Sequence, residues 1–344
     1  MHIAIRTDAS AAIGLGHLSR CLALADELAQ AGASVTFLCS NPDAAAADWI
    51  GRKSHSMRTW ADGEDGGWEA DAMASIVALP ARPDWLIVDH YALDCRWEQR
   101  LRPQVDRLAV IDDLADRHHH CDLLVDQTFG RDASAYAHLV QPDCLLALGT
   151  RYAMLRPAFA RVHGSAPAGF ERPRIHVFLG GGRPAKCLPR FVSLLLAAVP
   201  DITVAAVGGI DPRLDPDVRA VGSDRITWVD HVDDMASHMA RCDIAIGAPG
   251  MATWERACVG LPSAYLATVP NQVAILQRLD TEGFCRYLGR ADAIQDHAFV
   301  GGVAAFLANR PGLHAMRAVG LAQVDGRGVQ RIARCLRDGS LADD

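Results

Sequence analysis

The sequence predicts an α/β protein made of two αβα domains that face each other across a cleft. Short apolar runs alternate with segments of helical spacing, and the alternation restarts near residue 174 after a stretch rich in proline and glycine. A chain of 344 residues is also too long for one ordinary domain. Half of the residues are apolar, which is enough for two hydrophobic cores.

The first half contains apolar runs that we expect to be buried parallel strands. Trp85–Asp89 and Leu108–Asp112 each close on an aspartate, and ligand groups collect at the carboxyl ends of such strands. The other expected strands of this half are residues 3–5, 34–39, 122–126 and 144–148. We therefore assign residues 1–156 to an N-terminal domain.

The stretch 157–173 holds several prolines and glycines and few large apolar residues, so we expect it to be a linker. The C-terminal domain is then 174–344, with a helix over about 186–199 and helices filling most of the chain after Leu266. Its expected strands are residues 175–179, 202–207, 226–229, 243–246 and 263–266.

Composition limits the partners of this chain. The net charge of −7 argues against nucleic acid and against anionic membranes. No apolar run approaches the roughly 20 residues of a membrane span, and the N-terminus does not have the pattern of a signal peptide. The 10 cysteines form no C-x-x-C pair and fall mostly in apolar segments, as free thiols do in a reducing compartment. We expect a cytoplasmic monomer.

A glycine turn joins the first strand to the first helix. Gly14 and Gly16 let backbone N–H groups approach a ligand, and the helix start offers unpaired donors. His17 stands at that start, where an imidazole can take a proton from water near neutral pH. The alternative is a turn that only reverses the chain and a histidine in solvent.

A second junction of this kind follows the strand at 243–246. The turn Gly247–Gly250 leads into a helix, which is a natural seat for a diphosphate, and Glu255 lies one turn inside, where it can accept a ribose hydroxyl. Glu255 is alternatively a carboxylate favoured by the helix dipole, and Asn271 a simple helix cap.

The run His118–His120 lies near several aspartates and invites a metal interpretation. Neighbouring residues of a loop point in different directions, however, so we expect no metal and no cofactor. The P-loop pattern G-x-x-x-x-G-K-[ST] is also absent from the sequence.

Five blocks in one order resemble the UDP-sugar hydrolases of the pseudaminic acid pathway. These enzymes have the GT-B fold of two Rossmann-like domains, and they release 2,4-diacetamido-2,4,6-trideoxy-L-altrose from its UDP conjugate. The resemblance covers nearly the whole chain. The blocks are Arg6-x-Asp8 with Gly14-x-Gly16-His17-x-x-Arg20-Cys21; 88–91 with 93–94 and 97–98; 111–117 with 126–127; 148–156; and 254–255 with Gly260-x-Pro262 and 271–272.

The resemblance implies an inverting hydrolase that needs no metal and serves nonulosonic acid synthesis, commonly for flagellin glycosylation. His17 would be the general base for water, and Glu255 would bind the ribose. The expected sugar contacts are Asp8, Gly14, Leu15, Gly16, Tyr91, Asn271 and Gln272. The expected nucleotide contacts are Gly181, Arg183, Val232, Gly250, Met251 and Glu255.

The second junction departs from the family pattern. Met251 and Ala252 stand where the family usually has hydroxyl residues that meet phosphates, and Arg183 and Lys186 follow the other glycine-rich strand end. We expect Arg183 to take over phosphate contacts. Two other functions stay open: a GT-B glycosyltransferase with an acceptor other than water, and a sugar-nucleotide-binding protein without catalysis.

Overall fold

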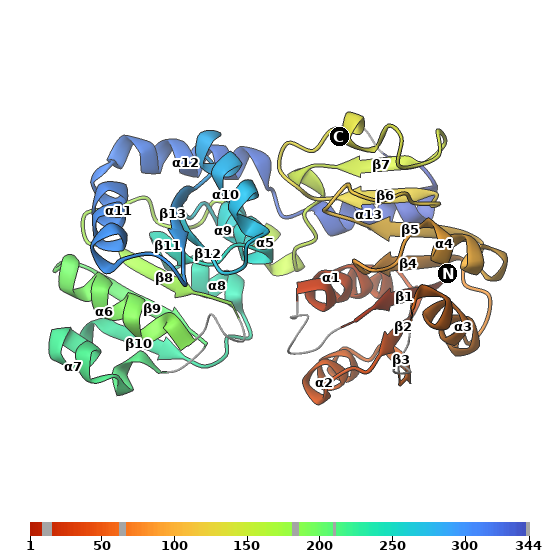
Figure 1. Ribbon diagram of the computed structural model, residues 1–344, viewed down its shortest axis with the longest axis horizontal. Coiled ribbons are helices and arrows are strands. Elements are labelled where there is room, and N and C mark those ends of the chain that lie inside the picture. The colour runs from red at the N-terminus through yellow and green to blue at the C-terminus, as the bar shows by residue number, and fades with distance from the viewer. Residues whose placement is uncertain (9–15, 62–66, 181–185, 209–210, 342–344) are drawn as a thin grey trace. The chain divides into compact units, whose positions relative to one another are not determined.

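The computed structural model describes residues 1–8, 16–61, 67–180, 186–208 and 211–341. The chain divides into two compact units (Figure 1). Unit 1 comprises Met1–Pro157 and Arg327–Asp344, and unit 2 comprises Ala158–Gly326. Each unit is built on a parallel β-sheet, which confirms the expected fold class of two α/β domains.

Unit 1 holds a seven-stranded sheet in the order β3-β2-β1-β4-β5-β6-β7, with every neighbouring pair parallel. Its central strands are almost wholly buried, as continuous apolar runs predict. The strands are β1 His2–Thr7, β2 Ser34–Ser40, β3 Ser56–Trp60, β4 Trp85–Asp89, β5 Arg107–Ile111, β6 Leu123–Asp126 and β7 Leu145–Leu148.

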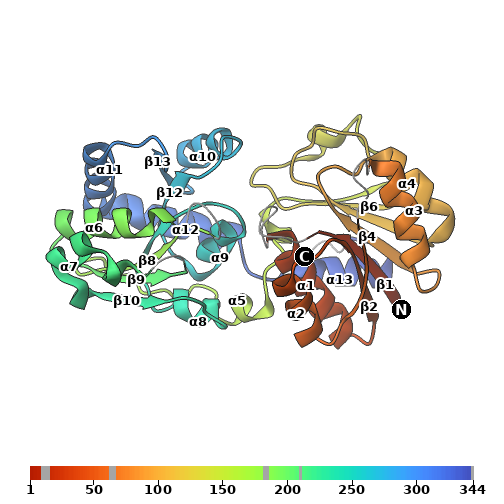
Figure 2. The same ribbon diagram turned by 60° about the horizontal axis from the view of Figure 1, so that its bottom comes forward.

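Helices cover both faces of this sheet (Figure 2). On one face α1 Gly16–Gln30, α2 Ala44–Arg52 and α13 Gly328–Asp338 share a core with Ile3 and Ile5. On the other, α3 Trp68–Ala78 and α4 Cys95–Leu101 pack around Leu86 and Trp97. Short 3₁₀ turns lie at Arg102–Gln104, Ala133–Tyr136 and Thr150–Tyr152.

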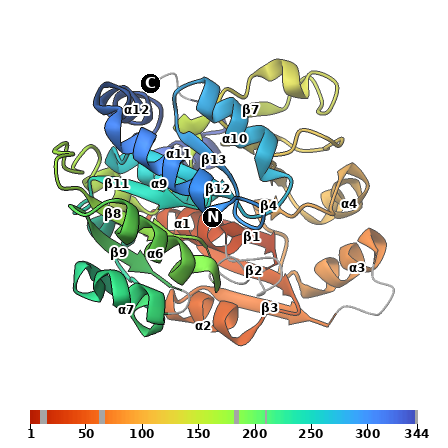
Figure 3. The same ribbon diagram turned by 60° about the vertical axis from the view of Figure 1, so that its left-hand side comes forward.

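Unit 2 holds a six-stranded parallel sheet in the order β10-β9-β8-β11-β12-β13. Figure 3 brings this unit and its helix α6 forward. The strands are β8 Arg174–Phe178, β9 Thr203–Val207, β10 Ile226–Val229, β11 Ile244–Gly247, β12 Ser263–Ala267 and β13 Arg286–Arg290. The helices are α5 Pro157–Arg161, α6 Leu188–Ala198, α7 Pro216–Gly222, α8 Met235–Met239, α9 Met251–Val259, α10 Gln272–Thr281, α11 Asp296–Ala308 and α12 Arg310–Gln323.

The unit boundaries differ from the expected domains 1–156 and 174–344. The last helix, α13, belongs to unit 1, where the indole N–H of Trp85 donates to the Leu336 carbonyl at 2.8 Å. The expected linker 157–173 is largely part of unit 2. It buries Phe159 and Phe170, and the backbone N–H of Ala166 donates to the Val259 carbonyl at 3.0 Å.

Both sheets have a point at which the strand order reverses. In unit 1 this point lies between β1 and β4, and in unit 2 it lies between β8 and β11. Ligands of open parallel sheets bind outside the carboxyl ends of the strands at such points. Within the described residues, no helix is long and apolar enough to span a membrane.

Candidate functional site

A buried histidine–aspartate pair lies at the reversal point of unit 1. Asp89 is the last residue of β4, and His17 is in the first turn of α1, which follows β1. The Nδ1 atom of His17 is 2.5 Å from a carboxylate oxygen of Asp89. The sheet and the helix thus bring together two side chains that are 72 positions apart in the sequence.

Arg20 fixes the orientation of this pair. Its Nε and one terminal nitrogen each donate to Asp89 at 2.6 Å. Asp89 is therefore ionised and accepts the Nδ1 proton of His17, which leaves Nε2 as the basic nitrogen. Among the described residues, none forms a hydrogen bond with Nε2, so this nitrogen can accept a proton from a ligand or a water molecule.

The environment keeps Asp89 charged. Burial alone would raise its pKa, but the positive charge of Arg20 and the hydrogen bonds from Arg20 and His17 hold the pKa well below its ordinary value. Asp89 is therefore a permanent negative charge beneath the imidazole. Such a charge stabilises the imidazolium that forms when His17 takes up a proton.

Tyr91 stands beside the imidazole, two residues beyond β4. Its ring meets that of His17 edge-on, with centroids 4.7 Å apart, and it is 49% exposed. Its hydroxyl donates to Asp113 at 3.3 Å, and Asp113 also accepts from Arg20 at 3.1 Å. His17 and Tyr91, both expected in the sugar site, are thus neighbours at one sheet edge.

Asp8, another expected sugar contact, is occupied by protein partners. It is 6% exposed and forms an ion pair with Arg6. Its carboxylate also accepts from the Ser40 backbone N–H at 2.9 Å and from Nε2 of His90 at 3.1 Å. These contacts favour a role in holding the ends of β1 and β2 and the segment after β4.

The sequence interpretation missed the partners that orient His17. The sequence indicates Asp89 as a strand end and as part of a family block, and it indicates Arg20 and Asp113 only as parts of such blocks. One signal was available, because Arg20 follows His17 at i+3 and so lies on the same helix face.

Two members of the histidine run, His119 and His120, contribute to a separate network around Glu98. His119 is 2% exposed and lies 2.6 Å from the Glu98 carboxylate, which also accepts from the backbone of His120. Tyr136 lies close by, bridging the strand-end carboxylates Asp112 and Asp126 at 2.9 and 2.8 Å. Within the described part of the chain, no group of three or more His, Cys, Asp or Glu side chains is arranged to hold a metal ion.

The reversal point of unit 2 is tightly packed. A Cβ on Gly247 would lie 2.0 Å from the Phe178 carbonyl oxygen, so only glycine fits there. Gly250 has φ of +110°, a conformation that glycine adopts without strain, and it immediately precedes α9. The turn thereby leads directly into the first turn of a nine-residue helix.

Other expected contacts lie around this turn. Met251 and Glu255 are half-buried in the first turns of α9, and Val232 is half-buried in the loop after β10. Asn271 is exposed just before α10, whereas the side-chain oxygen of Gln272 turns back to accept from the Thr268 backbone at 2.8 Å. Gly16 begins α1, but Gly14, Leu15, Gly181 and Arg183 lie outside the described residues.

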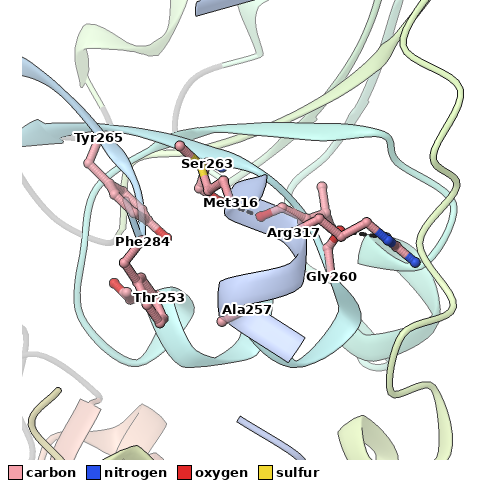
Figure 4. Close-up of a pocket in the computed structure, with 10 residues that line it drawn as sticks. Thr253, Ala257, Gly260, Ser263, Tyr265, Phe284, Met316 and Arg317 are labelled. Carbon is pink, nitrogen blue, oxygen red and sulfur yellow. Dashed lines mark hydrogen bonds between the residues drawn. The ribbon is translucent and has the colours of Figure 1, made fainter. Parts of the chain in front are cut away.

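One small pocket of unit 2 does not have the volume of a ligand site. It lies between α9, β12 and α12 and has a volume of about 10 Å³ (Figure 4). Thr253, Tyr265, Phe284 and Met316 are among its lining residues. A space of this size holds at most about one water molecule.

No family model matches the chain, but three curated proteins are similar to parts of it. A spore coat polysaccharide biosynthesis protein, SpsG of Bacillus subtilis, is 26% identical over 58% of this chain and 60% of its own length. A UDP-2,4-diacetamido-2,4,6-trideoxy-β-L-altropyranose hydrolase of Campylobacter jejuni is 27% identical over 46% of this chain and 53% of its own. The matches thus span little more than half the length of these relatives.

Solved structures resemble the chain over nearly its whole length. They include LpCGTa in complex with UDP, with a TM-score of 0.68, 13% identity and coverage of 97% of this chain and 99% of its own. MurG of Acinetobacter baumannii has a TM-score of 0.66 at 15% identity, covering 98% and 99%. The MnaA–UDP structure of S. aureus has a TM-score of 0.61 at 12% identity, covering 98% and 96%. The chain therefore has the GT-B fold.

Proposed function

We propose that this protein hydrolyses a UDP-activated diacetamido-trideoxy sugar at its anomeric carbon, releasing UDP and the free sugar for pseudaminic acid synthesis. The single observation that carries the proposal is the buried His17–Asp89 pair, whose imidazole keeps Nε2 available for a proton at the reversal point of a parallel sheet. The distant hydrolase relative from Campylobacter jejuni supports the choice of reaction.

In this reaction His17 takes a proton from water through Nε2 while the water oxygen attacks the anomeric carbon. The bond from that carbon to the phosphate oxygen breaks, and UDP leaves with the electron pair. Asp89 stabilises the imidazolium, and attack from the side opposite UDP inverts the anomeric centre. No redox partner or metal takes part in these steps.

The remaining expected residues receive proposed roles. Tyr91 and Asn271 contact the sugar, together with the backbone of the Gly14–Gly16 turn. Glu255 binds the ribose, and the turn before α9 holds the diphosphate through Gly250 and Met251, with Gly181, Arg183 and Val232 as further contacts. UDP complexes of other GT-B proteins support the choice of nucleotide.

A glycosyltransferase is the second candidate. The same imidazole nitrogen can deprotonate an acceptor hydroxyl as readily as water, and MurG shares the fold over nearly the whole chain. The two reactions differ only in the group that delivers the attacking oxygen.

Incubation of the purified protein with the UDP-sugar in H₂¹⁸O separates these functions. We expect UDP release without an acceptor and one ¹⁸O atom at the anomeric position of the sugar, with none in the UDP phosphates. Release that requires an added sugar or lipid acceptor would establish the transferase instead. Binding of UDP-sugar without release under either condition would leave a non-catalytic binding protein.

A further inference from the structure

Unit 2 contains a buried arginine that lacks a carboxylate partner. Arg256 of α9 is fully buried, and its terminal nitrogens donate to the carbonyls of Ala248 and Phe178, each at 3.1 Å. Its Nε has no hydrogen-bond partner. Among the described residues, none supplies a carboxylate within ion-pair distance of this guanidinium. A buried charge without a counter-charge is costly, so an arginine is rarely kept this way for stability alone.

The guanidinium also lies at the unfavourable end of its helix. Its two carbonyl partners belong to the end of β8 and to the turn just before α9, so the charge lies toward the helix N-terminus. The helix dipole is positive there, and a second positive charge is repelled by it. An anion bound at the turn would supply the missing counter-charge. It would also be attracted by the helix dipole that repels Arg256.

The described neighbours of Arg256 supply an aromatic face but no carboxylate. The guanidinium carbon lies 5.2 Å from the centroid of the Tyr265 ring. His176 of β8 is fully buried, and neither of its ring nitrogens has a hydrogen-bond partner. Burial and the nearby Arg256 lower the pKa of His176 well below its ordinary value, so this side chain is neutral at pH 7. Within the part of the chain that the structure describes, no carboxylate therefore balances the positive charge behind the turn.

We propose that Arg256 is the positioning residue of the diphosphate site. It holds the 248–250 turn through the carbonyls of Phe178 and Ala248 and supplies the positive charge that attracts phosphate to the start of α9. The inference rests on the proposed function. It also accounts for the lack of hydroxyl side chains at Met251 and Ala252, because a buried charge replaces the hydrogen bonds that such hydroxyls would donate to phosphate.

Arg317 of α12 provides a matched control, because its guanidinium lies at the C-terminal end of α9. One terminal nitrogen donates to the carbonyl of Gly260 at 2.6 Å (Figure 4). The other donates to the carbonyl of Gly164 at 2.7 Å. Like Arg256 it joins two segments through carbonyl groups. Its charge, however, lies at the helix C-terminus, where the dipole favours it.

Calorimetric titration of UDP, UMP and uridine into the full-length protein tests the proposal, using wild type, Arg256→Gln, Arg256→Lys and Arg317→Gln at 50 and 200 mM KCl. For Arg256→Gln we expect UDP affinity to fall at least about tenfold, the preference for UDP over UMP to shrink, and the salt dependence to weaken. Uridine affinity should stay unchanged. Arg256→Lys should keep most of the preference, and Arg317→Gln all of it.

Equal losses for UDP and uridine in Arg256→Gln, or no loss at all, would overturn the proposal. If Arg256→Gln does not fold, the Arg256→Lys variant decides. A folded Arg256→Lys that loses the preference for UDP over UMP would also overturn the proposal. Wild type that binds ADP or GDP but not UDP would refute the proposed substrate, and the Arg256 series would then be repeated with that nucleotide. Wild type that binds no nucleoside diphosphate would refute both.

Discussion

Replacing Asp89 by asparagine tests the site with the least change of shape. In the native protein this carboxylate accepts one hydrogen bond from His17 and two from Arg20. The amide of asparagine carries two N–H donors and one acceptor. Its NH₂ group would face donors, and the imidazole would have to move its proton to Nε2 to accept from it. His17 would then present a donor where the reaction needs a base.

The substitution should lower both turnover and stability. Loss of a positioned general base costs about 10²–10⁴-fold in turnover. Removing one member of a buried ion pair costs about 3–5 kcal/mol of unfolding free energy, and we expect the lower end because Arg20 keeps Asp113 as a partner.

The assay is UDP release from the UDP-sugar, combined with thermal unfolding and UDP titration. Asp26→Asn is the matched control, because Asp26 also pairs with a histidine, His55 at 3.0 Å, within unit 1. It should lose stability without a comparable loss of turnover. We expect UDP affinity to be unchanged in both variants, since the proposed nucleotide contacts lie in unit 2.

A folded Asp89→Asn variant with turnover within about threefold of wild type would refute the assignment of the base, because it falls far outside the range expected for general-base loss. Equal losses in Asp89→Asn and Asp26→Asn would point to a general loss of structure instead.

Three further predictions concern the same elements. His17→Gln should lower turnover by about 10²–10⁴-fold while UDP titration gives wild-type affinity, and near-normal turnover would remove His17 from the reaction. Gly247→Ala should lower the free energy of unfolding measured by chemical denaturation by about 1–3 kcal/mol, because its Cβ meets the Phe178 carbonyl. Gly301→Ala is the control, because its Cβ meets nothing within 4 Å and should not destabilise the protein. Equal stability of the two variants would contradict the packing at β11. Asp8 and Asp89 have folded-state pKa values below their unfolded ones, so the stability that they contribute is complete above about pH 4 and is lost as the pH falls further. Urea titrations between pH 5 and pH 2.5 should show this loss, and a flat profile would contradict it.

Sequence periodicity predicted the buried strands and the edge strands β7 and β10, but it missed the edge strands β3 and β13. Trp85–Asp89 is a strand with the expected bounds, because a central parallel strand is apolar on both faces. The edge strands β3 and β13 were missed, since Ser56–Trp60 and Arg286–Arg290 are largely exposed or half-exposed and carry no continuous apolar run.

The candidate site could be predicted from the sequence where it depends on residues that are close together in the chain. A glycine turn before a helix marks His17 and Gly250 directly. Asp89 contacts His17, and Arg256 contacts Phe178, both of them distant in the sequence. No local sequence pattern predicts such contacts. The place of α13 was hidden for the same reason, because an amphipathic helix does not specify which core it covers.

The return of α13 to unit 1 has a consequence for biosynthesis. Unit 2 is one uninterrupted segment whose ends meet, since a Cβ on Gly326 would lie 2.8 Å from the Ala160 nitrogen. A ribosome therefore delivers all of unit 2 before it delivers the helix that completes the α1 face of unit 1. Because domains generally fold as units during synthesis, unit 2 can finish folding while unit 1 still exposes apolar surface. Chaperone dependence should accordingly concentrate on the first unit to emerge, which is the last to be completed.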